Sequence, residues 1–223
     1  MGYIKWLGHS AFEILLDNKI LYIDPWISNP KSPIKLQDIS KADYIFITHD
    51  HGDHFGESVE IAKKTNATIV GIYEIANKAS QLGVKKTIGG NIGGPIFLEE
   101  NLITYLVPAL HSSLTGTPTG IIIRGSEKTI YHAGDTGVFG DMAIIHELYK
   151  PDIALIPIGG HYTMGPFEAA KAVELLKPEI VIPMHYGTFP VLSGTPEQLK
   201  KFIEERGIDV KIVVLKPGES YNF

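Results

Sequence analysis

The chain has 223 residues, 44% of them hydrophobic, a net charge of −5, and nine histidines but no cysteine. Without cysteine there is no disulfide framework, iron–sulfur cluster, zinc finger or cysteine nucleophile, so a bound metal would need nitrogen and oxygen ligands. Lys and Arg are dispersed, which argues against nucleic acid as a partner. A chain of this length is most simply one domain, residues 1–223.

The first residues lack the basic and then apolar layout of a secretory signal. No apolar stretch approaches the roughly 18 residues that span a bilayer. We therefore expect a cytoplasmic protein without stable membrane insertion. Association into a homo-oligomer stays open.

Short strands and helices alternate along most of the chain. Runs rich in β-branched residues predict strands at residues 2–7, 11–16, 19–24, 43–48, 67–72, 101–107, 119–124, 128–133, 152–158, 179–184 and 210–215. Helical spacing of apolar residues predicts helices at residues 57–65, 73–82, 140–148, 166–176 and 196–206. This alternation favours the α/β class.

The predicted elements fall into two loosely similar halves, with the change near residues 110–118. Each half opens with a β-meander and continues into β–helix–β units. The glycine-rich residues 89–95 are predicted as a loop because repeated Gly before Pro disfavours regular structure. We interpret it as a turn rather than a phosphate-binding loop, since no predicted strand leads into it and no helix follows.

A dense group of polar side chains follows the apolar strand predicted at residues 43–48. His49, His51, Asp53 and His54 fall within six positions. On a helix, residues i and i+2 point about 200° apart, so the first two histidines would face one metal only from a turn, which the following glycine allows. Four ligands are more than one tetrahedral ion takes beside a reactive water. Two metals are therefore more natural than one.

Residues 49–54 read His-Asp-His-Gly-Asp-His, which matches the His-x-His-x-Asp-His motif of the metallo-β-lactamase superfamily. Later signatures follow in the same order, with His111 in PALHSS, Asp135 in YHAGDTG and His185 in IPMHYG. The chain resembles this superfamily over almost its whole length. The resemblance implies a four-layer αβ/βα sandwich with its site along the edge where two sheets meet.

The same resemblance implies a binuclear metal site. The resemblance implies that His49, His51 and His111 bind the first ion. It implies that Asp53, His54 and His185 bind the second ion, and that Asp135 bridges the two. This leaves room for a bridging water or hydroxide, the open position that catalysis needs. Two divalent ions are expected, zinc first, although nitrogen and oxygen donors also suit manganese, nickel and iron.

Asp53, Asp135 and His161 are the candidate catalytic residues, the two carboxylates through the metals. His161 follows the strand predicted at residues 152–158, on the side where Asp135 and His185 should lie. It is the best candidate to give the leaving group a proton. The alternatives are that it only shapes the pocket or hydrogen-bonds a phosphate.

Several further residues lie near the implied ligands in the sequence. Asp24 either starts a turn or orients ligand imidazoles through their free N–H groups. Tyr186 either lines the pocket or packs in the interior. His9 stands in a segment that resembles a motif of this branch, without an assigned role, while His132 is expected to be structural and His146 to lie on the surface.

Residues 159–190 resemble compact metal-dependent hydrolases related to ascorbate-phosphate lactonases and to N-acyl-phosphatidylethanolamine phospholipase D. The resemblance implies hydrolysis of a small-molecule ester, lactone or phosphodiester by a metal-bridging hydroxide. Antibiotic-hydrolysing relatives commonly use a cysteine at the second metal, which this chain lacks. A catalytically silent or regulatory metal-binding protein of the same fold is the alternative.

Overall fold

The computed structural model describes residues 2–223. Its strands are β1 (Tyr3–Trp6), β2 (Phe12–Leu16), β3 (Lys19–Ile23), β4 (Tyr44–Ile47), β5 (Thr68–Ile72), β6 (Thr87–Gly90), β7 (Pro95–Phe97), β8 (Ile103–Pro108), β9 (Thr119–Arg124), β10 (Thr129–His132), β11 (Ile153–Pro157), β12 (Ile180–Met184), β13 (Lys211–Ile212) and β14 (Ser220–Asn222). Its helices are η1 (Leu36–Asp38), α1 (Gly52–Phe55), α2 (Ser58–Thr65), α3 (Tyr73–Gln81), α4 (Met142–Tyr149), α5 (Pro166–Leu176) and α6 (Pro196–Glu205). Every strand and helix that the sequence predicts is present.

The strands form two seven-stranded sheets of matching design. The first has the order β14-β1-β2-β3-β4-β5-β6 and the second the order β13-β12-β11-β10-β9-β8-β7. In the first sheet the strands are antiparallel up to β3 and parallel beyond it. In the second sheet β7 to β10 are antiparallel and β10 to β13 parallel.

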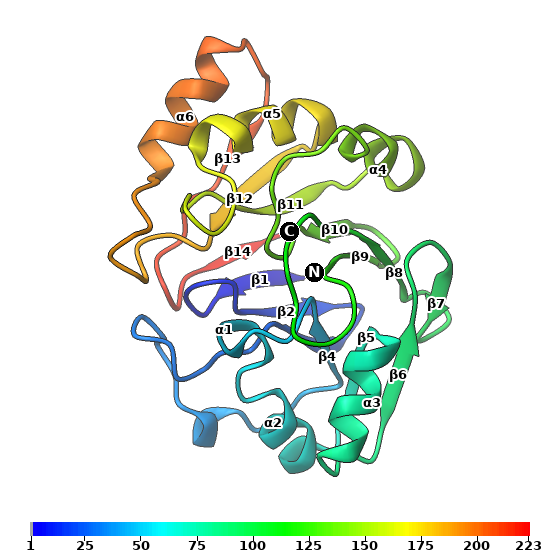
Figure 1. The fold of residues 1–223 in the computed structure, drawn as a ribbon. Helices are drawn as coiled ribbons and strands as arrows, with labels where there is room; N and C mark the ends of the chain where they lie inside the picture. Colours follow the sequence, from blue (N-terminus) through cyan, green and yellow to red (C-terminus); the bar gives the residue numbers. More distant parts are fainter. Residues whose placement is uncertain (1) are drawn as a thin grey trace.

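The two sheets pack face to face, and helices cover both outer faces. Figure 1 shows α2 and α3 on the side of the first sheet and α4, α5 and α6 on the side of the second. Side chains alternate along the strands, so Ile121 and Ile123 face the first sheet while Ile122 faces the helices. This arrangement confirms the four-layer αβ/βα sandwich.

The glycine-rich residues 89–95 are not wholly a loop, as the sequence predicted. Strand β6 runs to Gly90 and β7 begins at Pro95, each at the edge of its sheet. A Cβ on Gly89 would lie 3.1 Å from Cα of Tyr73, so glycine lets α3 pack closely on β6. An edge strand also tolerates proline. Only residues 91–94 connect the two strands.

The boundary between the two halves of the molecule lies earlier in the chain than the sequence predicted. Strands β7 and β8 already belong to the second sheet, so the chain crosses between sheets at residues 91–94 and not near 110–118. The unpredicted β14 then returns to the first sheet and pairs with β1, where Asn222 lies opposite Tyr3. This strand of three residues is too short to show a hydrophobic pattern.

Within residues 2–223, no helix combines the length and the apolar character that crossing a membrane requires.

Candidate metal centre

The predicted ligands from distant parts of the chain follow strands that end at one edge of the two sheets. His49 follows β4, His111 follows β8, Asp135 follows β10 and His185 follows β12. Strands β8 and β10 both run antiparallel to β9, and β10 and β12 both run parallel to β11, so their carboxyl ends point the same way. The topology therefore gathers these side chains at one place.

The motif after β4 combines a turn with one turn of helix. His49 lies before the helix, and His51, the N-cap of α1, has extended backbone angles. The sequence predicted a turn here but not α1, whose four residues are too few for helical periodicity to show. The helix turns His54 into the interior, whereas the Asp53 side chain keeps 25% of its surface exposed.

Three histidines form the first predicted ligand set. Nε2 of His49 lies 3.0 Å from Nδ1 of His51. The ring of His111 is centred 5.1 Å from that of His49 and 5.2 Å from that of His51. One ring nitrogen of each histidine lies within 4.8 Å of those of the other two. This spacing fits three nitrogens around one ion.

The second predicted set surrounds the carboxylate of Asp135. Its Oδ1 lies 3.2 Å from Nε2 of His54, and its Oδ2 lies 3.1 Å from Nε2 of His185. All three side chains are buried, yet Oδ1 of Asp135 and both Nε2 atoms lack a hydrogen-bond partner. Buried polar atoms are normally paired, so these unpaired donors and acceptors fit a divalent cation.

Asp24 contacts the Nδ1 side of His54 directly and that of His49 through the hydroxyl of Thr48. Its Oδ2 lies 2.7 Å from Nδ1 of His54 and accepts a 2.6 Å hydrogen bond from the hydroxyl of Thr48. That hydroxyl lies 3.0 Å from Nδ1 of His49. With both Nδ1 atoms engaged, Nε2 of each ring is left for a metal. The sequence left two roles open for Asp24, and the structure shows both. Its carbonyl oxygen accepts a hydrogen bond from the backbone N–H of Trp26 in a turn, and its side chain contacts a predicted ligand, His54.

Burial and charge set the protonation of these groups. Burial is the main cause that lowers the pKa of His49, to about 3, so its imidazole is neutral. Burial opposes a charge on His54 too, but the carboxylates of Asp135 and Asp24 raise its pKa well above the usual value. Burial would raise the pKa of Asp135, yet His54 and His185 hold it well below its usual range. A metal ion would therefore displace a proton from His54.

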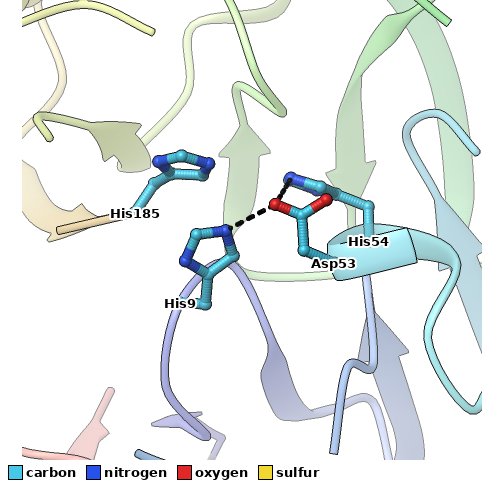
Figure 2. A group of neighbouring side chains, drawn as sticks. All are labelled: His9, Asp53, His54 and His185. Carbon is cyan, nitrogen blue, oxygen red and sulfur yellow. Dashed lines mark hydrogen bonds and ion pairs between the residues drawn. The ribbon is translucent and has the colours of Figure 1, made fainter. Parts of the chain in front are cut away.

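His9 is the residue at this site to which the sequence assigned no role. It is completely buried in the turn between β1 and β2, and its Nε2 lies 3.1 Å from Oδ2 of Asp53. Figure 2 shows the ring directed at Asp53, close to His54 and His185. Strands β1 and β3 run in the same direction, so this turn lies at the edge where β3 ends. A histidine in such a turn is the signal that could have revealed it.

An open cavity of about 680 Å³ lies beside these ligands. Its lining residues are Trp26, His51, Gly52, Asp53, His111, Ser112, Asp135, Tyr162, His185 and Phe189. The rings of Trp26 and Phe189 stack with centroids 5.8 Å apart. The cavity thus combines the predicted ligands with an aromatic wall, and its volume is that of a small-molecule site.

His161 does not line this cavity. It is exposed after β11, with its ring 4.6 Å from that of Tyr162, which does line it. Its role as a proton donor stays a prediction. Tyr186 packs in the interior, stacked on Trp6 at 5.3 Å.

The remaining histidines lie away from the cavity. His132 is buried in β10, with Nε2 3.0 Å from the carbonyl oxygen of Ser10, as a structural histidine should be. His146 lies half-buried on α4. Neither belongs to the groups of neighbouring ligand atoms.

Several residues around the site have left-handed backbone conformations. The φ angles are 53° for His9, 45° for Asp24, 64° for His161 and 55° for His185. His and Asp tolerate this region better than most side chains, although glycine adopts it more easily. Strained backbone often gathers at functional sites, where the surrounding structure holds it in place.

Comparison with known proteins places the chain in a family. A family model described as a beta-lactamase superfamily domain matches residues 19–186. The UPF0173 metal-dependent hydrolase of Staphylothermus marinus is 56% identical over 230 residues, which cover 100% of both chains. That of Caldivirga maquilingensis is 55% identical over 223 residues, covering 100% of this chain and 98% of the relative.

A solved structure agrees over the same length. Igni18, described as a novel metallo hydrolase from the hyperthermophilic archaeon Ignicoccus hospitalis, matches with a TM-score of 0.94 and 45% identity, covering 100% of this chain and 99% of that one. The span of the family model includes every predicted ligand from His49 to His185. The chain therefore belongs to the beta-lactamase superfamily and, within it, to the UPF0173 family of metal-dependent hydrolases.

Proposed function

We propose that the protein is a binuclear hydrolase that acts on a small-molecule ester, lactone or phosphodiester. The position of Asp135 carries this proposal. One of its oxygens faces His54, and the other lies 3.1 Å from His185 and 3.5 Å from His111. The carboxylate thus lies between residues of both predicted ligand sets, as a bridging ligand should.

The predicted ligands fall into two neighbouring groups. His49, His51 and His111 lie together and would hold the first ion, while Asp53, His54 and His185 lie together, with His9 beside them, and would hold the second. Divalent ions bound here would lower the pKa of a coordinated water and polarise the carbonyl or phosphoryl oxygen of the substrate. Zinc is the first candidate, and manganese, nickel and iron suit the same donors.

The chain's own residues would orient the ligands and the substrate. Asp24 and Thr48 fix which ring nitrogens of His54 and His49 face the site. The rings of Trp26 and Phe189 offer an apolar surface beside Asp53 and His185. A cavity of this kind beside the ligands favours catalysis over the alternative of a silent metal-binding protein.

The test is metal reconstitution followed by a substrate panel. Metal-free protein would be loaded with zinc, manganese, nickel or iron, and bound metal counted by mass spectrometry. The panel would hold bis-p-nitrophenyl phosphate, carboxylic esters, plain and phosphorylated lactones, and N-acyl lipids. We expect two ions per chain and turnover of at least one class.

The variant Asp135→Ala should stay folded, bind fewer ions and lose turnover. A matched control is Asp43→Asn, which alters a carboxylate that accepts a hydrogen bond from the backbone N–H of Ile20 outside the site. It should retain metal and turnover. Two bound ions with no turnover of any substrate would favour the silent metal-binding protein instead.

A further inference from the structure

His9 is a buried histidine that the predicted ligand set does not use. Its ring has no exposed surface and lies within hydrogen-bond distance of Asp53, 3.1 Å from Nε2 to Oδ2. An ionised carboxylate only accepts hydrogen bonds, so Nε2 carries the hydrogen and donates it. Figure 2 shows this contact as the link between the β1–β2 turn and α1.

The position of His9 is fixed from several sides. Its carbonyl oxygen accepts hydrogen bonds from Nε1 of Trp6, at 2.9 Å, and from the backbone N–H of His185, at 3.0 Å. Its ring is centred 3.9 Å from that of His185 and 5.3 Å from those of Trp26 and Phe189. A donor held this firmly can fix the direction of the group that accepts from it.

Asp53 is the member of the second ligand set that most needs such a donor. The rings of His54 and His185 are held by burial, with 0% and 1% of their side-chain surface exposed. The Asp53 side chain is 25% exposed at the cavity, on a helix of one turn. Apart from His9, no group of residues 2–223 makes a hydrogen bond to its carboxylate.

We propose that His9 is a positioning residue that orients the carboxylate of Asp53 as a ligand of the second metal ion. The inference rests on the proposed function, because it takes the second ion to be bound by Asp53, His54 and His185. A hydrogen-bonded carboxylate still has lone pairs free for a metal. Groups that hold ligands in this way typically change metal affinity about 10- to 100-fold when they are removed.

Two substitutions separate the hydrogen bond from the imidazole itself. The amide nitrogen of glutamine is as many bonds from Cβ as Nε2 of histidine, so His9→Gln can still donate to Asp53. The amide of His9→Asn is one bond shorter and falls short of Asp53, while asparagine suits the left-handed backbone of this turn. Ser10→Ala is the matched control, because it removes a buried hydroxyl with no hydrogen-bond partner from the same turn.

The measurement is stepwise titration of metal-free protein with Co²⁺ and with Zn²⁺, followed by calorimetry and, for cobalt, the visible spectrum. We expect His9→Asn to bind the second ion about 10- to 100-fold more weakly and the first ion unchanged. The cobalt bands of the second ion should shift in His9→Asn. In His9→Gln the affinity and the bands should return most of the way to wild type, and Ser10→Ala should behave as wild type.

A double-mutant cycle covers variants that perturb folding. In an Asp53→Ala background, which removes the acceptor, the further change His9→Asn should weaken binding of the second ion by less than twofold. Circular dichroism would check that each variant is folded.

Two results would overturn the inference. One is a second-ion affinity in His9→Asn equal to that of the wild type. The other is a loss in His9→Gln as large as that in His9→Asn, which would make the imidazole itself a ligand. If the wild type binds two ions but cleaves nothing in the panel, only the proposed function fails, because the His9 comparison is decided by affinity. If it binds a single ion, both fail.

Discussion

Oδ2 of Asp24 lies 2.7 Å from Nδ1 of His54, and neither side chain is exposed. The same oxygen accepts from the hydroxyl of Thr48, which lies 3.0 Å from Nδ1 of His49. One buried carboxylate thus holds a predicted ligand of each ion. Burial alone would raise the pKa of Asp24, but the neighbouring imidazoles, His54 first, lower it.

Asp24→Asn should weaken binding of both ions, by about 10- to 100-fold. It should also lower the free energy of unfolding by about 3 kcal/mol, because His54 loses one of its two charged partners in the interior. Calorimetric metal titration and urea unfolding measure the two effects. Asp43→Asn, the control outside the site, should lose about 1 kcal/mol and keep its metal affinity. Unchanged metal affinity in Asp24→Asn would remove Asp24 from the site.

Asp50 should stabilise the conformation of the segment that follows His111. Its side chain is buried beside Nζ of Lys78, at 2.8 Å, and accepts hydrogen bonds from Ser113 and from the backbone N–H of Leu114. Asp50→Ala should cost about 3 to 5 kcal/mol of stability, since a buried charge network is broken. Hydrogen exchange should rise over residues 112–116.

The comparison for that variant is an exposed ion pair. Lys200 lies 3.9 Å from Glu204 on α6, with both side chains largely exposed. Lys200→Ala should change stability by less than about 0.5 kcal/mol. If urea unfolding gives the same small loss of stability for Asp50→Ala as for Lys200→Ala, the buried contacts of Asp50 do not stabilise the segment after His111.

The aromatic wall of the cavity should act on substrate binding. Phe189→Ala removes a ring that stacks on Trp26, and we expect KM for esters with an aromatic or long acyl group to rise about tenfold. Acetate esters should change little, because they are too small to cover the wall. Steady-state kinetics with an acyl-length series distinguish the two. An equal rise in KM along the series would contradict this role.

His161 can be tested by the leaving group. A general acid matters most when the leaving group is a poor one, such as an alkoxide, and hardly at all for p-nitrophenolate. If His161 donates this proton, His161→Gln should lower kcat for alkyl esters by about 100-fold or more and leave p-nitrophenyl esters unchanged. Tyr162→Phe is the matched comparison on the cavity wall. If His161→Gln changes kcat by the same factor for both ester types, His161 is not the proton donor.

The metal-free protein should lose stability as the pH falls from 6.5 to about 4. Burial, the largest cause, lowers the pKa of His9 to about 4 and that of His49 to about 3, from 6.5 in the unfolded chain. In this range the unfolded chain binds protons at both residues and the folded chain does not. The free energy of unfolding should fall by up to roughly 1.4 kcal/mol per pH unit for each residue.

Urea unfolding of metal-free protein at pH 4.5, 5.5 and 6.5 measures this slope. Burial lowers the pKa of His111 and His132 as well, so His9→Asn removes one of several such groups and should make the slope shallower. A stability that does not change across this range would mean that both imidazoles titrate at their ordinary pKa in the folded protein.

The sequence predicted the central strands and missed three of the four edge strands, β6, β7 and β14, for physical reasons. Long apolar segments such as residues 152–158 are buried on both faces, so their composition alone marks them as strands. Strand β6 ends in two glycines, and β14 has three residues, so neither carries a hydrophobic signal. The helix α1 is a single turn and has no period to detect.

The residues of the site likewise divide into those that the sequence predicted and those that it did not. The motif of residues 49–54 and the later His111, Asp135 and His185 carry a signal because their order and spacing are characteristic. His9 carries only a weak signal, a segment that resembles a motif without an assigned role, and Asp50 carries none of its own. The importance of both depends on which distant groups the fold brings to them. Only the antiparallel course of β1 and β2 places His9 beside Asp53, and a sequence pattern does not state that contact.

The left-handed backbone at His9, Asp24 and His185 also bears on how this protein can evolve. Each position departs from the conformations that ordinary side chains prefer, at a penalty of about 1 to 3 kcal/mol. Glycine would relieve that strain and remove the imidazole or carboxylate with it. Selection for heat resistance alone would therefore favour replacing these three residues with glycine. Lineages that still carry the strained side chains here are those in which the chemistry of the site is being maintained.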